Sequence, residues 1–103
     1  MIAVGMKMKL IKHGDSADVL FDGRLDAQSA PDAEKALLDM AERFQSVDLD
    51  LAKLEYISSA GLRAFRNFNM TMRKGGKEYK VKNVPKTIME IFEMTGYSRL
   101  LRL

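Results

Sequence analysis

The stretch that decides the fold is VDLDLAKLEYISSAGL, which runs from Val47 to Leu62. Apolar and acidic residues alternate from Val47 to Ala52, and this period of two predicts a strand followed by a loop. Pattern alone is also compatible with a partly helical segment. After the two serines, apolar residues recur at spacings of three and four up to Met72, which predicts a helix. The glycine pair at 75 and 76 predicts its end.

The sequence on either side continues this alternation of strands and helices. Upstream, the turn residues of 13–15 separate two short apolar segments and predict a β-hairpin, and Ser29 is the expected N-cap of the next helix. The predicted strands are 6–12, 17–21, 47–52, 78–84 and 100–103, and the predicted helices are 29–45, 59–74 and 85–93. This order favours an α/β fold, in which a small mixed, largely parallel β-sheet has an N-terminal hairpin edge and is covered by α-helices.

The composition is that of one folded domain spanning residues 1–103. Hydrophobic residues make up 47% of the chain and charged residues 30%, as in average globular domains. The absence of cysteine excludes disulfides and thiolate chemistry, and it fits a reducing compartment. The apolar runs are too short to cross a bilayer, and residues 1–12 lack the pattern of a secretion signal. We therefore expect a cytoplasmic protein.

Charge is distributed unevenly along the chain. Residues 13–55 contain eleven acidic and four basic residues, whereas residues 63–86 contain eight basic residues and Glu78 as the single acid. Such a separation could steer a protein partner or a nucleic acid, or it could simply be a solvated face. Because no recognition motif accompanies the basic region, we expect no direct contact with nucleic acid.

Ser58 to Gly61 lie at a predicted junction between a strand and a helix. Unpaired backbone N–H groups and the helix dipole at such a junction favour a capping oxygen or an anion. One serine is expected to cap the helix, and phosphate binding or phosphorylation is the functional alternative. A phosphate there would add roughly 1.5 to 2 negative charges at pH 7, which the helix would tolerate and an acidic or apolar partner would not.

The residues give no catalytic constellation. Ser59 and Gly61 match half of a G-x-S-x-G elbow, but Ile57 stands at the first glycine position. The single histidine, His13, lies in the predicted first turn rather than near a nucleophile. No set of residues has metal-ligand spacing, so neither an enzyme nor a cofactor or metal site is expected.

Two acids invite a functional interpretation because they stand beside predicted junctions. Asp26 precedes the first helix, and Asp50 lies near the end of the third strand. Residues at such positions can share one surface, although capping and turn roles are the simpler explanation for both.

The stretch from Val47 to Leu62 resembles the core motif of STAS domains, and in particular that of bacterial anti-sigma factor antagonists. The segment 23–26 resembles the G-x-L-D segment of this family, 74–76 its helix-ending glycines, and 81–96 its last strand and helix. The resemblance covers nearly the whole chain and implies a single STAS domain.

In that family, a kinase that is also the anti-sigma factor phosphorylates a serine of this motif, and a phosphatase removes the phosphate. The unphosphorylated form binds the anti-sigma factor and releases the sigma factor. Aligning the family's D-S-S-G-L motif on Gly61-Leu62 places the phosphate acceptor at Ser59, with Ser58 as the second choice because it stands in place of the aspartate. The partner-binding residues implied by the resemblance are Asp26, Ser58, Ser59, Ala60, Gly61 and Arg63.

The resemblance thus implies a non-enzymatic, partner-switching regulator of transcription. Its expected partners are an anti-sigma factor that acts as a serine kinase and a phosphatase, without a membrane. The alternative is a constitutive STAS interaction or scaffold subunit of a signalling or transport assembly, working without phosphorylation.

Overall fold

The structure is a computed structural model that describes residues 2–3 and 6–103. Its strands are β1 (Ile2–Ala3), β2 (Met6–His13), β3 (Ser16–Leu25), β4 (Ser46–Ile57) and β5 (Glu78–Lys82). Its helices are α1 (Ala30–Arg43), α2 (Ser59–Lys74), α3 (Lys86–Thr95) and α4 (Tyr97–Leu100). None of the helices in this part of the chain is long and apolar enough to cross a membrane.

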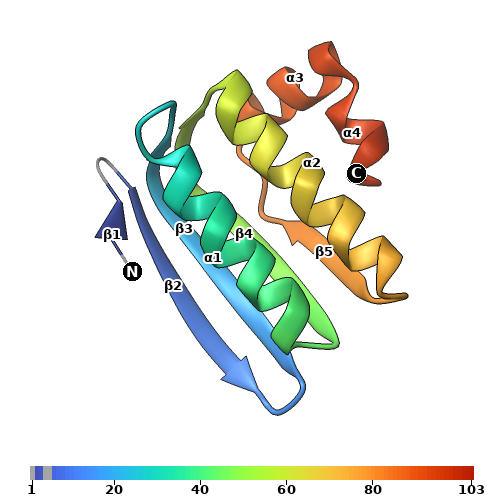
Figure 1. The fold of residues 1–103 in the computed structure, drawn as a ribbon. Helices are drawn as coiled ribbons and strands as arrows, with labels where there is room; N and C mark the ends of the chain where they lie inside the picture. Colours follow the sequence, from blue (N-terminus) through green and yellow to red (C-terminus); the bar gives the residue numbers. More distant parts are fainter. Residues whose placement is uncertain (1, 4–5) are drawn as a thin grey trace.

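The five strands form one mixed sheet in the order β1-β2-β3-β4-β5. β1, β2 and β3 pair antiparallel, whereas β3, β4 and β5 run parallel. Figure 1 shows α1 and α2 side by side across one face of the sheet. The helices α3 and α4 lie beside α2, on the side away from α1. The predicted α/β class, with its N-terminal hairpin and helical cover, is confirmed, and the short β1 adds a strand outside the hairpin.

The core lies between this sheet face and the helices. Alternation buries every second side chain of β3 as far as Phe21 and of β4 as far as Leu51, including Val19 and Leu49, which are fully buried. Three aromatic rings connect the sheet with the helices. The ring of Phe65 in α2 packs edge-on against Phe21 of β3, with 5.5 Å between ring centroids. It also packs at a tilt against Phe92 of α3, with 6.3 Å between centroids. Burial of such side chains is the main source of stability in a chain without disulfides.

The loop predicted after Ala52 is wrong, because β4 continues to Ile57. β4 stays paired with β3 because it contains two extra residues. One lies between the pairs Leu20–Asp50 and Asp22–Lys53, and the other lies between Gly23–Leu54 and Arg24–Tyr56. Each extra residue is a β-bulge. The bulges change the burial period from two to three beyond residue 51, which is why alternation stopped being visible in the sequence.

The strand predicted at 100–103 is also wrong. The chain turns at Gly96, which has a φ of +81°, and then forms the single turn of α4. Leu101 donates its N–H to the carbonyl of Tyr97 at 2.8 Å and is itself buried. A short apolar run at a chain end has the same pattern in a strand and in a helical turn, so burial decided the outcome.

Candidate functional site

The site lies where two parallel strands end together. β3 ends at Leu25 and β4 ends at Ile57, and the N–H of Ser58 donates to the carbonyl of Leu25 at 2.9 Å. Because the carboxyl ends of parallel strands meet at one edge of the sheet, the two following segments lie close together. This edge brings Asp26 together with the serines that open α2.

Ser58 is the helix cap. Its backbone is extended, with φ −93° and ψ 175°, and its Oγ accepts from the N–H of Gly61 at 3.3 Å. Its carbonyl accepts the first regular helical bond, from the N–H of Leu62 at 2.9 Å. The hydroxyl of Ser58 therefore satisfies one of the backbone donors that a helix start leaves unpaired.

Ser59 differs from its neighbour in having an unengaged side chain. It is the first residue of α2 and is exposed to solvent. No hydrogen bond joins its hydroxyl to another residue of the described chain. A free hydroxyl at the positive end of a helix dipole is accessible to modification and tolerant of added negative charge.

Asp26 caps the turn that leads into α1. Its Oδ1 accepts from the N–H groups of Gln28 and Ser29, each at 3.1 Å, and its carbonyl accepts from Ala30 at 2.8 Å. The N–H of Ser29 is the main cause that lowers the pKa of the Asp26 carboxyl. This geometry supports the capping interpretation, and it holds the carboxylate in one position on the surface.

Ser29 is the N-cap residue of α1, as predicted, but its side chain does not cap the helix. Ser29 does precede the first helical residue, but its backbone is already helical and its side chain makes no capping bond. Its buried Oγ instead donates to the carbonyl of Arg24 at 2.8 Å and accepts from the N–H of Asp26 at 3.0 Å. Ser29 thus fastens the end of β3 to the start of α1, while the carboxylate of Asp26 closes the turn between them.

Gly61 allows α2 to approach the sheet closely. A Cβ atom at this position would lie 2.8 Å from Cγ of Leu25, 2.9 Å from Cγ1 of Ile57 and 3.0 Å from the carbonyl oxygen of Leu25. The first two distances are shorter than contacts that real Cβ atoms make, and the third is tighter than most of them. The buried Gly61 therefore lies beneath the predicted partner surface rather than on it, and fixes the height of α2 above the strand ends.

The remaining predicted site residues lie around the serines. Ala60 is half-buried and packs against the core, whereas Arg63 is exposed one turn into α2. A further exposed pair, not predicted from the sequence, is Arg24 and Tyr56: the guanidinium carbon of Arg24 lies 4.4 Å from the centroid of the Tyr56 ring. They are register partners only because of the second bulge in β4, so no sequence signal announces this pair.

Asp50 does not join the site. Its Oδ1 accepts from the N–H of Ala52 at 3.0 Å, within the first bulge of β4. This local bond is a turn-type role, in agreement with the simpler explanation given to this acid.

Among the residues that the structure describes, no histidine lies beside the serines. His13 lies in the hairpin, at the opposite end of β3, where its Nε2 is 3.2 Å from Oδ2 of Asp18. Within the described ranges, no three or more of His, Cys, Asp and Glu are grouped closely enough to hold a metal ion. The arrangement can receive a group on Ser59 or bind a partner, but it contains no base that would activate the hydroxyl.

Comparison with known sequences gives a consistent result. Residues 8–102 match the family model described as "Mlab, STAS domain". The anti-sigma-B factor antagonist of Staphylococcus epidermidis is 27% identical over 101 residues, covering 97% of this chain and 94% of that protein. The anti-sigma-B factor antagonist of Bacillus subtilis strain 168 is 27% identical over 79 residues, covering 77% of this chain and 72% of that protein.

Solved structures show the same fold at lower identity. The anti-sigma factor antagonist SpoIIAA in its unphosphorylated form superposes with a TM-score of 0.79 at 11% identity, covering 91% of this chain and 84% of that one. The Bacillus SpoIIAA in its phosphorylated form gives 0.74 at 11% identity, with 91% and 87% covered. An anti-sigma factor antagonist from Mycobacterium paratuberculosis gives 0.76 at 19% identity, with 91% and 80% covered.

Proposed function

This chain belongs to the STAS domain family, and we propose that it is an anti-sigma factor antagonist whose binding to its partner is switched by phosphorylation of Ser59. The observation that carries the proposal is the contrast between two adjacent serines. Ser58 is engaged in capping α2, whereas Ser59 is exposed and unengaged at the helix start. The similar anti-sigma-B factor antagonists support the class of partner.

Phosphorylation of Ser59 would act through charge rather than through refolding. A phosphate brings roughly 1.5 to 2 negative charges at pH 7, and the N-terminus of α2 stabilises them. Arg63 lies four residues further along the same helix, a spacing at which side chains of opposite charge interact. The fold can accept the modification, while a partner surface that is packed against Ser59 cannot accept it without a large desolvation cost.

The proposed docking surface surrounds Ser59 and consists of Asp26, Ser58, Ala60 and Arg63, with Gly61 setting the height of the helix beneath it. The caps at Asp26 and Ser58 hold this surface rigid before a partner arrives. A preorganised surface loses little conformational entropy on binding. Because the site offers no base of its own, the chemistry is assigned to the partners: an anti-sigma factor that is also a serine kinase, and a phosphatase. We place this exchange in the cytoplasm.

The test is a binding titration with purified anti-sigma factors of the source organism. Wild type and Ser59→Ala should bind one of them with similar affinity, whereas Ser59→Asp should bind at least about tenfold more weakly, a difference of about 1.4 kcal/mol. Ser58→Asp is the matched control, because it places the same negative charge on Ser58, the second choice of phosphate acceptor. Equal binding by wild type, Ser59→Ala and Ser59→Asp would instead support a constitutive interaction or scaffold subunit.

A further inference from the structure

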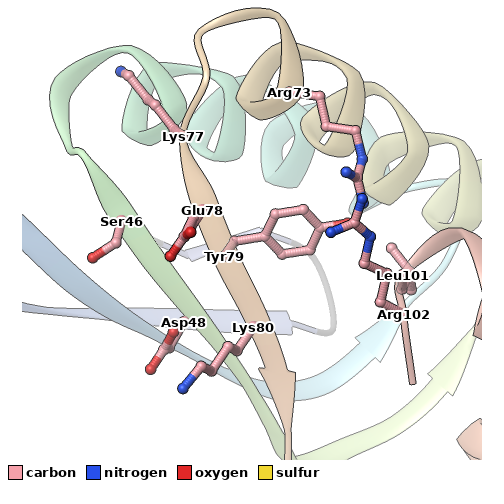
Figure 2. A pocket seen from close by; sticks show the side chains of 9 residues that line it. All are labelled: Ser46, Asp48, Arg73, Lys77, Glu78, Tyr79, Lys80, Leu101 and Arg102. Carbon is pink, nitrogen blue, oxygen red and sulfur yellow. The ribbon is translucent and has the colours of Figure 1, made fainter.

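A cavity at the other end of α2, far from the serines along the helix, is basic and has no role in the proposed switch. Its volume is about 390 Å³, and we call it the basic pocket. Its lining residues are Ser46, Asp48, Arg73, Lys77, Glu78, Tyr79, Lys80, Leu101 and Arg102. Figure 2 shows Arg73 from α2 and Arg102 from the chain end converging beside the ring of Tyr79.

A buried amide outside the lining holds two of the residues that form the basic pocket. The Oδ1 atom of Asn69, a residue with 3% exposure, accepts from the hydroxyl of Tyr79 at 2.5 Å and from Nε of Arg73 at 3.0 Å. These bonds hold the half-buried Tyr79 and the stem of the Arg73 fork. They leave the terminal nitrogens of Arg73 directed toward Arg102, as Figure 2 shows.

Arg102 reaches the pocket by an unusual backbone conformation. Its φ is +59°, a left-handed value that disfavours residues with a Cβ atom and that glycine adopts freely. The turn is closed by two bonds, from the N–H of Arg102 to the carbonyl of Arg99 at 3.2 Å and from Leu103 to Ser98 at 2.8 Å. An arginine stands where glycine would fit the backbone better, and this is the kind of local strain that accompanies functional sites.

The two guanidinium groups have no acidic partner in the structure. Within the described part of the chain, neither Arg73 nor Arg102 forms an ion pair. The two acids of the lining do not pair with these arginines. Glu78 lies on the opposite face of β5 from Tyr79. Asp48 lies 3.7 Å from Lys82, with which it forms an ion pair. Two cations close to one tyrosine, without a counter-charge, attract an anion.

We propose that the basic pocket binds the phosphate group of a small phosphorylated ligand, with Arg73 and Arg102 as its anchors. Two guanidinium forks match the oxygens of a phosphate or diphosphate, and the ring of Tyr79 forms the wall beside them. The volume of about 390 Å³ extends to both faces of β5, so the part beside Tyr79 suits a small phosphorylated group rather than a protein segment. This site is independent of the proposed switch at Ser59.

The experiment is isothermal titration of the full chain with pyrophosphate at physiological ionic strength. Wild type should bind one equivalent saturably, and Arg73→Gln and Arg102→Gly should each weaken binding at least tenfold. Lys74→Gln is the matched control, because Lys74 is an exposed cation next to Arg73 that does not line the pocket. It should change the affinity less than twofold. Titrations with inorganic phosphate and AMP then distinguish a free phosphate from a nucleotide as the source of the group.

Arg102→Gly separates loss of binding from loss of the fold. Glycine accepts a φ of +59° and removes one of two neighbouring cations, so this variant should melt at or above the temperature of the wild type while losing the ligand. Absence of saturable binding to wild type would overturn the proposal. An equal loss in Lys74→Gln would also overturn it, as would tighter binding of a polyglutamate peptide than of pyrophosphate.

A spectroscopic readout locates the ligand in the basic pocket. Burial raises the pKa of Tyr79, while the charges of Arg73 and Arg102 oppose that rise. Bound pyrophosphate offsets these charges, so the phenolate absorbance of Tyr79 should appear at a higher pH when ligand is present. An unchanged titration at saturating pyrophosphate would place the ligand elsewhere and contradict the assignment.

Discussion

The two ends of α2 are built in opposite ways. At its start, the hydroxyl of Ser58 pairs one backbone donor and the helix lies directly on the strand ends at Gly61, while the hydroxyl of Ser59 bonds to no described residue. At its end, the cations Arg73 and Lys74 face solvent and a cavity, and no acid pairs with them within the described residues. The start holds one exposed hydroxyl in a fixed position, where a phosphate could be added. The end carries two positive charges, those of Arg73 and Lys74. One helix can thereby carry two separate functions.

The largest expected effect comes from filling the close contact at the start of α2. Gly61→Ala should lower the free energy of unfolding by about 2–3 kcal/mol, because the added carbon meets backbone as well as side-chain atoms. Helix propensity alone would predict the opposite sign, a gain of about 1 kcal/mol. Urea denaturation measures the difference.

Gly75→Ala is the control at the other end of the helix. There the nearest atom to an added Cβ is in the flexible side chain of Lys77, at 3.4 Å, so the change should stay within about 0.5 kcal/mol. If both alanine variants unfolded at the same urea concentration, the close approach at Gly61 would have no energetic importance.

A smaller effect is expected at the two serines. Ser58→Ala removes the capping oxygen and should cost about 1 kcal/mol of stability, whereas Ser59→Ala should be nearly neutral because its hydroxyl bonds to no described residue. Thermal unfolding of the two variants compares them directly. A larger loss in Ser59→Ala than in Ser58→Ala would reverse the roles assigned to the pair.

The start of α1 should be sensitive to acid through Asp26. The pKa of its carboxyl is lowered in the folded state, mainly by the N–H of Ser29. A lowered pKa contributes stability above the unfolded value of about 3.9, and this contribution is lost as the pH falls through the lower folded value. Asp26→Asn should therefore be less stable than wild type at pH 7, and the difference should disappear as the pH falls below the folded value. Asp39→Asn, which removes only an exposed ion pair with Arg43, is the control.

At the basic pocket, stability should instead fall at high pH, through ionisation of Tyr79. This is the smallest of the expected effects near neutral pH. Burial raises the pKa of Tyr79, so its contribution to stability is complete below the unfolded value of about 10 and is lost as the pH rises through the higher folded value. Wild type should lose stability relative to Tyr79→Phe as the pH rises above about 10 in urea denaturation. The same loss relative to Tyr97→Phe would show that the effect is not specific to the pocket.

The start of α2 could be predicted from sequence because its signals are local. The two serines, the small residues after them and the helical spacing from Leu62 onward lie within one short segment, and each acts on its own neighbours. The hairpin is local in the same sense, since its turn at Gly14 needs a φ of +64° that glycine provides. These elements were found at the predicted positions.

What could not be predicted depends on partners distant in sequence. The bulges of β4 exist only in register with β3, and they determine both the length of the strand and the meeting of Arg24 with Tyr56. The basic pocket joins α2, β5 and the residues after α4, and the last of these was expected to be a strand. Its two arginines meet because of a turn with positive φ at a residue other than glycine, which no propensity favours.

The proposed switch depends on Ser59, and it is tested most directly by expressing the chain in its own host and measuring its phosphorylation. Intact mass and tryptic phosphopeptides covering residues 56–63 should show a reversible gain of one phosphate in wild type and none in Ser59→Ala. A phosphate retained in Ser59→Ala would move the acceptor to Ser58 and contradict the assignment, and no phosphate under any growth condition would contradict the switch itself.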